Sequence, residues 1–178
     1  MVKPDAGRFT VAEAEAKLRG PASRLPAVLL AAGSDDFLRE RLVLACRAGA
    51  ESEGAEFQRF EGDQLDAETF AGALATLSLF GEARRVWIRE GSKMVRSVEE
   101  TLLAWADAPG EGVFVLVTTA RDTDELKFLE TLAAKTATVS CGLGPGEGLA
   151  WAQRLAQEAG LKLPGATVET LYQAGADL

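Results

Sequence analysis

Histidine is absent from the 178-residue sequence, and cysteine occurs only twice, at Cys46 and Cys141. Without an imidazole, the chain can form neither a Ser-His-Asp triad, nor a Cys-His pair, nor a histidine-ligated metal site. The two cysteines lack CxxC spacing, which predicts two ordinary buried thiols of a cytoplasmic protein. We therefore expect no catalytic residues, no metal ion and no cofactor.

Long apolar runs are absent as well. The longest uninterrupted one, residues 27–32, is far too short to cross a bilayer, and the amino-terminal residues lack the apolar core of a signal peptide. These features predict no membrane association. The length suits one full domain, or one domain and part of another.

The charge balance excludes another class of function. Acidic residues outnumber basic ones by 27 to 19, which gives a formal net charge of −8. Affinity for DNA phosphates comes mostly from lysine and arginine, so an acidic chain is a poor binder of DNA on its own.

Strand and helix patterns alternate along the first 141 residues. Strand patterns occupy residues 26–32, 56–61, 85–90, 113–118 and 137–141. Candidate helix caps fall between them, at Thr10 with Glu13, Ser34 and Asp35, Asp66, Ser97 with Glu100, and Asp122 with Glu125. This alternation predicts an α/β fold in which helices flank a mostly parallel sheet on both faces, as three layers.

A glycine-rich segment at residues 142–148 breaks both periodicities and predicts a domain boundary. It is followed by helical patterns at residues 149–159 and 166–174. Two short helices bury little apolar surface by themselves, so we expect them to begin a second domain.

The turn at Gly33 invites comparison with a phosphate-binding loop, because it joins a strand to a helix. It lacks the second glycine and the lysine of such a loop, and Asp35 and Asp36 would repel phosphate. The strand at residues 113–118 also lacks a carboxylate pair for Mg²⁺. In the glycine-rich segment, the spacing is not that of a dinucleotide site and Pro145 removes a backbone donor. We therefore expect no ATP hydrolysis.

Two large apolar residues, Leu79 and Phe80, fall off the inward stripe of the predicted helix that carries Phe70 and Leu74. From this pattern alone, local burial is the more common outcome and contact with a partner is the alternative. A second unusual feature is a group of basic residues in this acidic chain: Arg84, Arg85, Arg89, Lys93 and Arg96. It predicts either a solvated edge or a contact with nucleic acid or an acidic partner.

Several motifs follow one another in a fixed order along the sequence. The most specific is S-L-F-G at residues 78–81, after a helix, supported by G-x-D-D-x-L-x-E at residues 33–40. Further segments are Arg85-Val86-Trp87-Ile88-Arg89, Leu149-Ala150-Trp151 and Gly160-Leu161-Lys162-Leu163. In these motifs and their order, the sequence resembles the δ subunit of the bacterial DNA polymerase III clamp loader.

The resemblance implies an AAA+-like, P-loop NTPase-type domain over residues 1–141. Gly33 and Ser34 would occupy a degenerate P-loop position that binds no nucleotide. Residues 142–178 would be the start of a small helical lid domain, and the collar domain of that family has no counterpart in this sequence.

The resemblance also implies a function in DNA replication. The chain would bind the ring-shaped sliding clamp (β) and help to open it, inserting Leu79 and Phe80 into the clamp, with Thr76, Leu77 and Ser78 beside them. Its partners would be the clamp and the other loader subunits, with DNA only in the assembled complex and no homo-oligomer. It would be no enzyme by itself, but part of the polymerase III holoenzyme, a DNA-directed DNA polymerase and thus a nucleotidyltransferase. Two alternatives stay open: a divergent nucleotide-binding AAA+ domain, and a sister subunit that acts as a stator.

Overall fold

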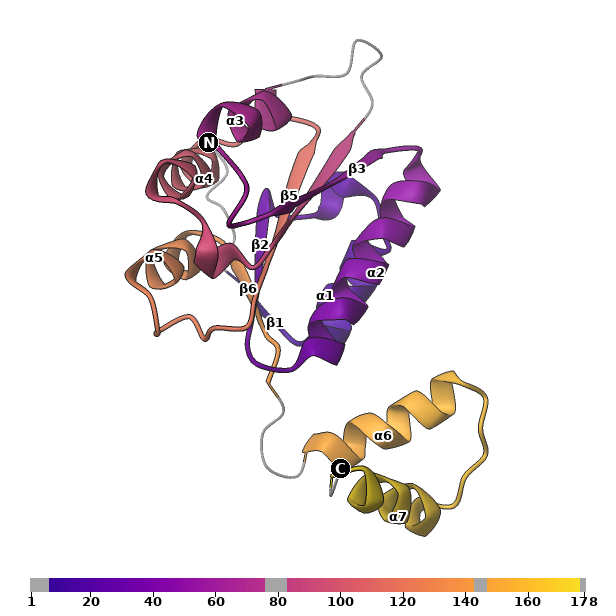
Figure 1. The fold of residues 1–178 in the computed structure, drawn as a ribbon. Helices are drawn as coiled ribbons and strands as arrows, with labels where there is room; N and C mark the ends of the chain where they lie inside the picture. The colour runs from indigo at the N-terminus through magenta and orange to yellow at the C-terminus, as the bar shows by residue number, and fades with distance from the viewer. Residues whose placement is uncertain (1–6, 76–82, 143–146, 177–178) are drawn as a thin grey trace. The chain divides into compact units, whose positions relative to one another are not determined.

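The computed structural model describes residues 7–75, 83–142 and 147–176 (Figure 1). The chain divides into two compact units, which we call unit 1 (Met1–Gly142) and unit 2 (Leu143–Leu178).

Unit 1 is built on a six-stranded sheet in the order β1-β6-β2-β5-β4-β3, and all neighbouring strands pair in parallel. The strands are β1 (Arg8–Phe9), β2 (Val28–Ala32), β3 (Glu56–Glu61), β4 (Arg84–Arg89), β5 (Val113–Thr119) and β6 (Ala137–Ser140). The five predicted strands and their parallel arrangement are confirmed. The strand β1 was not predicted, because a two-residue strand has no periodicity and exists only through its pairing with Thr138 and Val139.

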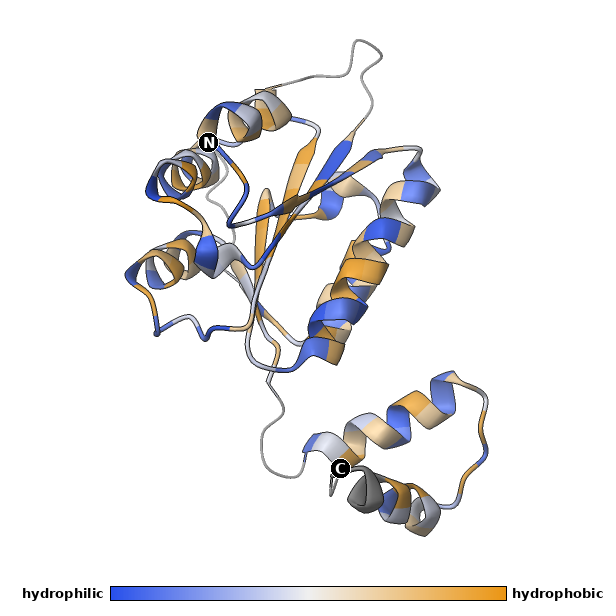
Figure 2. Cartoon of the chain, viewed as in Figure 1, coloured by the Kyte–Doolittle hydropathy of each residue, from blue (hydrophilic) through white to orange (hydrophobic). Residues whose placement is uncertain are grey.

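Helices cover both faces of this sheet, which confirms the predicted three layers (Figure 1). One face carries α1 (Val11–Leu18) and α2 (Asp36–Glu53), and the other carries α3 (Ala67–Ala75), α4 (Arg96–Asp107) and α5 (Lys127–Lys135). Two short 3₁₀ helices, η1 (Ala22–Arg24) and η2 (Gly91–Lys93), lie in the connections. Figure 2 shows the apolar residues concentrated in the central strands, as expected for strands buried on both faces.

Three of the predicted helix caps are confirmed. Thr10 and Glu13 form a reciprocal capping box at the start of α1. The Asp35 carboxylate accepts the backbone N–H of Leu38 at 3.0 Å, and the Asp66 carboxylate accepts that of Thr69 at 2.8 Å. Each satisfies a backbone donor that the first turn of a helix leaves without an intrahelical partner.

The other two predicted caps are wrong. The helix α4 begins before Ser97, because the Val95 carbonyl already accepts the N–H groups of Val98 and Glu99, while Glu100 pairs with Arg96 instead of capping. Asp122 and Glu125 close an isolated turn, in which each backbone N–H bonds to the other residue. Since Leu126 is extended, with φ −134°, α5 starts only at Lys127.

The larger apolar core lies between the sheet and helices α3, α4 and α5. Each helix contributes residues with no exposed surface, including Phe70, Leu102 and Leu129. They pack against alternate residues of the central strands, among them Leu30, Val86, Ile88, Val115 and Val117. The inward-facing residues of the strands, which alternate along the chain, thus pack against the apolar stripes predicted for the helices.

On the opposite face, the fully buried side chain of Arg85 joins three elements. Its guanidinium donates to the Leu18 carbonyl at the end of α1, to the Gly20 carbonyl at 2.7 Å and to the Glu53 carboxylate at 2.7 Å. A Cβ atom at Gly49 would overlap both the Leu18 carbonyl oxygen and the Arg85 guanidinium, so only glycine fits at this point of α2.

Unit 2 consists of α6 (Glu147–Glu158) and α7 (Gly165–Ala176), which pack against each other. Both were predicted from the sequence. Gly160 adopts a left-handed conformation, with φ +71°, and the chain turns there so that the Leu161 N–H reaches the Ala156 carbonyl at 2.8 Å. Among the residues that the structure describes, no helix is both long and apolar enough to span a membrane.

The buried ion pair of Arg85 leads to a stability prediction. Replacing Glu53 by alanine leaves the Arg85 charge buried without its carboxylate, and we expect the free energy of unfolding to fall by about 3 kcal/mol. Urea denaturation followed by tryptophan fluorescence measures this change. Glu51→Ala is the matched control: its side chain is 67% exposed and pairs with Arg47, so its effect should stay below about 0.5 kcal/mol. Equal effects of the two substitutions would contradict a structural role for the Arg85–Glu53 pair.

Candidate partner-binding site

The predicted clamp-contacting residues Thr76, Leu77, Ser78, Leu79 and Phe80 lie outside the described residues. The structure does describe both ends of this connection. The helix α3 leads to Ala75, with Phe70, Ala73 and Leu74 buried as the predicted stripe requires. On the other side, the chain is described again from Ala83, directly before β4.

The connection joins α3 to the amino end of β4. Because all strands are parallel, the amino end of β4 lies at the edge of the sheet opposite to the carboxyl ends of the strands. Ligands of open α/β sheets usually bind at the carboxyl ends. The Gly33 turn, in contrast, follows the carboxyl end of β2. The Gly33 turn and the start of β4 therefore lie at opposite edges of one sheet.

Arg84 links the two ends of the connection. Its Nη1 donates to the Ala73 carbonyl in the last turn of α3 at 2.8 Å, and its Nε donates to the Glu56 carboxylate of β3 at 2.8 Å. The side chain is only 10% exposed. Backbone hydrogen bonds attach the start of β4 to its two neighbours in the sheet. The Ala83 carbonyl accepts the N–H of Glu56 at 3.0 Å, and the Arg84 N–H donates to the Gly112 carbonyl at 2.7 Å.

At the opposite edge, the Gly33 turn is closed by the protein itself. The Gly33 N–H donates to the Thr119 carbonyl at 3.1 Å, and the Asp35 N–H donates to the Cys141 carbonyl at 2.9 Å. Gly33 has φ +135°, and a Cβ atom there would lie 2.6 Å from the carbonyl of Cys141. Two backbone donors that a phosphate cradle would need are thus already bonded.

Arg39 completes the closure of this turn, although it was not among the residues predicted to be functional. Its buried guanidinium donates to the Gly33 carbonyl and pairs with Asp36. The cation is therefore held by protein oxygens, in a turn whose sequence lacks the phosphate-binding lysine. A signal was available, since Asp36 and Arg39 have the spacing of a helical ion pair.

The two thiols are buried, as predicted. Burial raises the pKa of Cys46 and the pKa of Cys141 to about 12 each, so both remain protonated at neutral pH. A thiol with such a pKa is a poor nucleophile and a poor metal ligand. Within the described ranges, no group of three or more Cys, Asp or Glu side chains is arranged to hold a metal ion.

The five basic residues do not form one basic surface, and that prediction is wrong for Arg84 and Arg85. These two are buried because β4 is an interior strand with helices on both faces, and they pair with Glu56 and Glu53. The other three are exposed, and each has a carboxylate partner, in the pairs Arg89–Glu61, Lys93–Glu90 and Arg96–Glu100.

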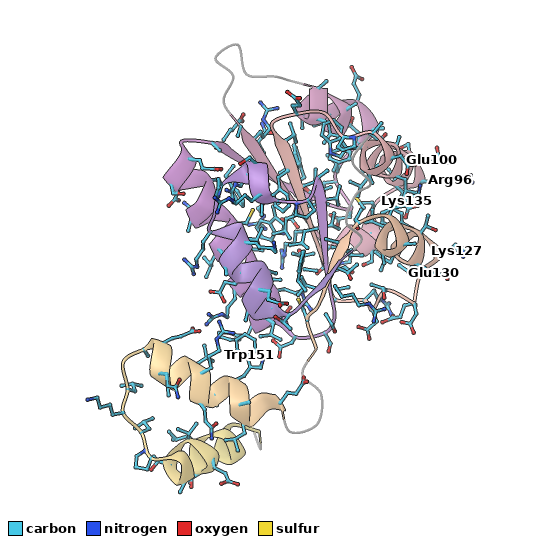
Figure 3. The ribbon with its side chains drawn as sticks, turned by 180° about the vertical axis from the view of Figure 1, so that it is seen from behind. Arg96, Glu100, Lys127, Glu130, Lys135 and Trp151 are labelled. Carbon is cyan, nitrogen blue, oxygen red and sulfur yellow. The ribbon has the colours of Figure 1, made fainter. Side chains whose placement is uncertain are left out.

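Figure 3 shows Arg96 and Glu100 on α4 near the pair Lys127–Glu130 on α5, on the outer side of these helices. Basic and acidic side chains alternate there. A solvated, mixed-charge surface is the better description of this region than a nucleic-acid contact.

No protein-family model matches the chain, and no curated protein matches its sequence. Solved structures do resemble it. The clamp loader delta protein YqeN of Bacillus subtilis matches with a TM-score of 0.71 and 14% sequence identity, over 90% of this chain and 51% of its own.

Two structures from Thermotoga maritima match less closely. The Holliday junction branch migration motor RuvB has a TM-score of 0.57 and 17% identity, over 91% of this chain and 53% of its own. A DNA polymerase III gamma subunit-related protein has a TM-score of 0.55 and 15% identity, over 92% of this chain and 57% of its own. The chain thus spans about half the length of these proteins. At this identity the likeness concerns the fold, and it confirms the predicted AAA+-like, P-loop NTPase-type architecture.

The closed Gly33 turn predicts the outcome of a nucleotide titration. Because its backbone donors and its arginine are bonded within the protein, we expect ATP with Mg²⁺ to give no saturable heat in calorimetry up to about 1 mM. The midpoint of thermal unfolding should not change with ATP either, since a ligand that does not bind the native state cannot stabilise it. A micromolar site would show that the turn opens, and would restore the nucleotide-binding alternative.

Proposed function

We propose that the chain is the clamp-binding part of a DNA clamp-loader subunit, and that it binds the ring-shaped sliding clamp through Leu79 and Phe80. The observation that carries the proposal is the position of the S-L-F-G motif between α3 and β4, in a fold that is similar to the clamp loader delta protein of Bacillus subtilis. Thr76, Leu77 and Ser78 would flank the contact. In such a role the chain would act in the cytoplasm and bind other loader subunits.

The closed turn at Gly33 supports this proposal over a nucleotide-driven activity. The backbone N–H groups of Gly33 and Asp35 and the guanidinium of Arg39 are already bonded within the protein. The carboxyl edge of the sheet therefore has few donors left to bind a phosphate at this turn. A subunit of this kind would contribute binding energy, while other subunits of the assembly would supply any ATP hydrolysis. It would meet DNA only within that assembly, which agrees with its net charge of −8.

The apolar contact has enough free energy for the proposed task. Burying a leucine and a phenylalanine is worth roughly 3–6 kcal/mol at typical values. A ring opens through this contact only if the subunit binds the open interface more tightly than the closed one. If about half of the energy is differential, the opening equilibrium shifts by roughly one to two decades.

The proposal predicts the result of a binding measurement. The double variant Leu79→Ala plus Phe80→Ala should bind the sliding clamp at least about a hundredfold more weakly than the unmodified chain, because it loses most of the buried apolar surface. Surface plasmon resonance with immobilised clamp gives both dissociation constants.

The matched control is Phe37→Ala plus Leu44→Ala. It removes the same two residue types from exposed positions on α2, where the residues are 51% and 54% exposed. This variant should bind the clamp like the unmodified chain. If the Leu79/Phe80 variant also keeps full affinity, the assignment of the contact is wrong. If the unmodified chain does not bind the clamp at all, a stator-like subunit becomes the better description.

A further inference from the structure

The strand β3 forms one edge of the sheet, and half of its backbone groups face away from the other strands (Figure 1). Along a strand, the backbone groups of successive residues point to opposite sides. The Glu56 N–H donates to the Ala83 carbonyl and the Gly62 N–H to the Arg89 carbonyl, so the even-numbered residues of β3 bond to β4. The residues whose backbone groups point outward are Phe57, Arg59 and Glu61.

These outward groups form a continuous row. Within the described ranges, the N–H groups of Phe57, Arg59 and Glu61 and the carbonyls of Phe57 and Arg59 have no hydrogen-bond partner. The row ends at the Glu61 carbonyl, which accepts the N–H of Gln64 at 3.1 Å. All six residues of β3 pair one to one with β4, and no proline interrupts the strand. A regular edge with such groups can receive a further strand.

The side chains on one face of this edge determine which residues fit beside it. The rings of Phe57 and Trp87 are stacked, with their centroids 6.5 Å apart. The Arg59 guanidinium lies over the Trp87 ring, 4.9 Å from its centroid, and the Arg59 side chain is 51% exposed. An apolar side chain opposite Phe57 would extend this layer of aromatic rings.

The charges on the same face favour an acidic neighbour. Glu61 pairs with two arginines, Arg59 and, at 3.6 Å, Arg89, and both arginines are about half exposed. Two guanidinium groups thus share one carboxylate, which gives a local excess of positive charge in a chain of net charge −8. An acidic residue opposite Arg59 would balance this excess, and an exposed pair such as Arg59–Glu61 costs little to rearrange. Charged residues on an edge strand also disfavour pairing with purely apolar strands, so the same charges select the partner.

We propose that β3 binds an extended segment of a partner protein, which adds to the sheet as an antiparallel strand. The segment carries an acidic residue opposite Arg59 and, two positions later, an apolar residue opposite Phe57. Antiparallel pairing is slightly more stable per residue than parallel pairing, and it sets side chains directly opposite each other. The inference uses none of the residues of the proposed clamp contact and does not depend on that proposal.

The probe is the capped hexapeptide Thr-Val-Glu-Thr-Val-Thr with a neutral fluorophore, and its fluorescence anisotropy with the full chain gives a dissociation constant. In the proposed register its glutamate lies opposite Arg59 and its second valine opposite Phe57. We expect saturable binding below about 1 mM. A peptide with lysine in place of the glutamate should bind at least about fivefold more weakly, because it sets two like charges opposite each other.

Backbone methylation of the peptide tests the strand geometry. The N–H groups of its glutamate and of its second valine would donate to the carbonyls of Arg59 and Phe57, so methyl groups on these two nitrogen atoms should weaken binding at least about tenfold. The matched control carries the methyl groups on the first valine and the second threonine. The N–H groups of these residues point away from β3, so this peptide should bind like the unmodified one.

Variants of the chain test the side-chain contact. Arg59→Glu should reverse the preference, so that the lysine peptide binds more tightly than the glutamate peptide. The matched control is Arg47→Glu, at a residue of α2 that is 65% exposed and pairs with Glu51, and it should keep the original preference. If Arg59→Glu does not fold, Arg59→Gln takes its place and should lose the preference for the glutamate peptide.

Hydrogen exchange of single backbone amides, measured by NMR, locates the bound strand. The glutamate peptide should slow the exchange of Phe57 and Arg59, whose N–H groups point outward. It should leave the exchange of Gln58 and Phe60 unchanged, because these amides already bond to β4.

Several results would overturn the inference: no saturation up to about 1 mM, equal binding of the two methylated peptides, or an unchanged preference in Arg59→Glu. Slow exchange of Phe57 and Arg59 without peptide, in a sample that sediments as a dimer, would overturn it as well, since β3 would then pair with a second copy of the chain.

Discussion

Unit 1 contains a positive charge with no exposure to water, the guanidinium of Arg85, and much of its packing follows from how that charge is satisfied. A charge in such a place is tolerable only with oxygen partners close to it. These come from the end of α1, from the following turn and from Glu53 at the end of α2. The Glu53 carboxylate also accepts the N–H of Ala22, so the same acid holds the turn after α1. The positions of α1, α2 and β4 are therefore coupled through one side chain, and Gly49 leaves the room for it.

Because the sheet is parallel, the carboxyl ends of the strands lie at one edge of unit 1 and the amino ends at the other, and the two edges differ in their hydrogen bonds. At the carboxyl edge, the turn after β2 is filled by its own hydrogen bonds and by Arg39. At the amino edge, the link between α3 and β4 is secured by Arg84. Both edges have a buried arginine that donates to a backbone carbonyl. At the carboxyl edge Arg39 closes the turn after β2, and at the amino edge Arg84 bonds to α3.

Much of this architecture was predictable, and the failures have physical causes. The apolar runs at β2 and β5 and the polar caps Thr10, Asp35 and Asp66 are local signals, and they were interpreted correctly. The strand β1 was missed because it depends wholly on β6, more than a hundred residues away in the chain. The arginines of β4 were assigned to a surface because charge normally means exposure. Their partners become neighbours only in the folded domain, Glu56 when β3 pairs with β4 and Glu53 when α2 packs on the sheet. For Leu79 and Phe80 the sequence motif remains the basis of the prediction.

The strand order has a consequence for how the chain is made. Although β2 is the second strand along the chain, its neighbours in the sheet are the fifth and the sixth. During synthesis on a ribosome, β2 has no strand to pair with until β5 has been made, and it lacks its second neighbour until β6 has been made. Sheets with such distant pairings fold slowly, and their unpaired strands are prone to aggregate in the meantime. The helix α2, which follows β2 directly and packs against it, is the first element available to cover that strand.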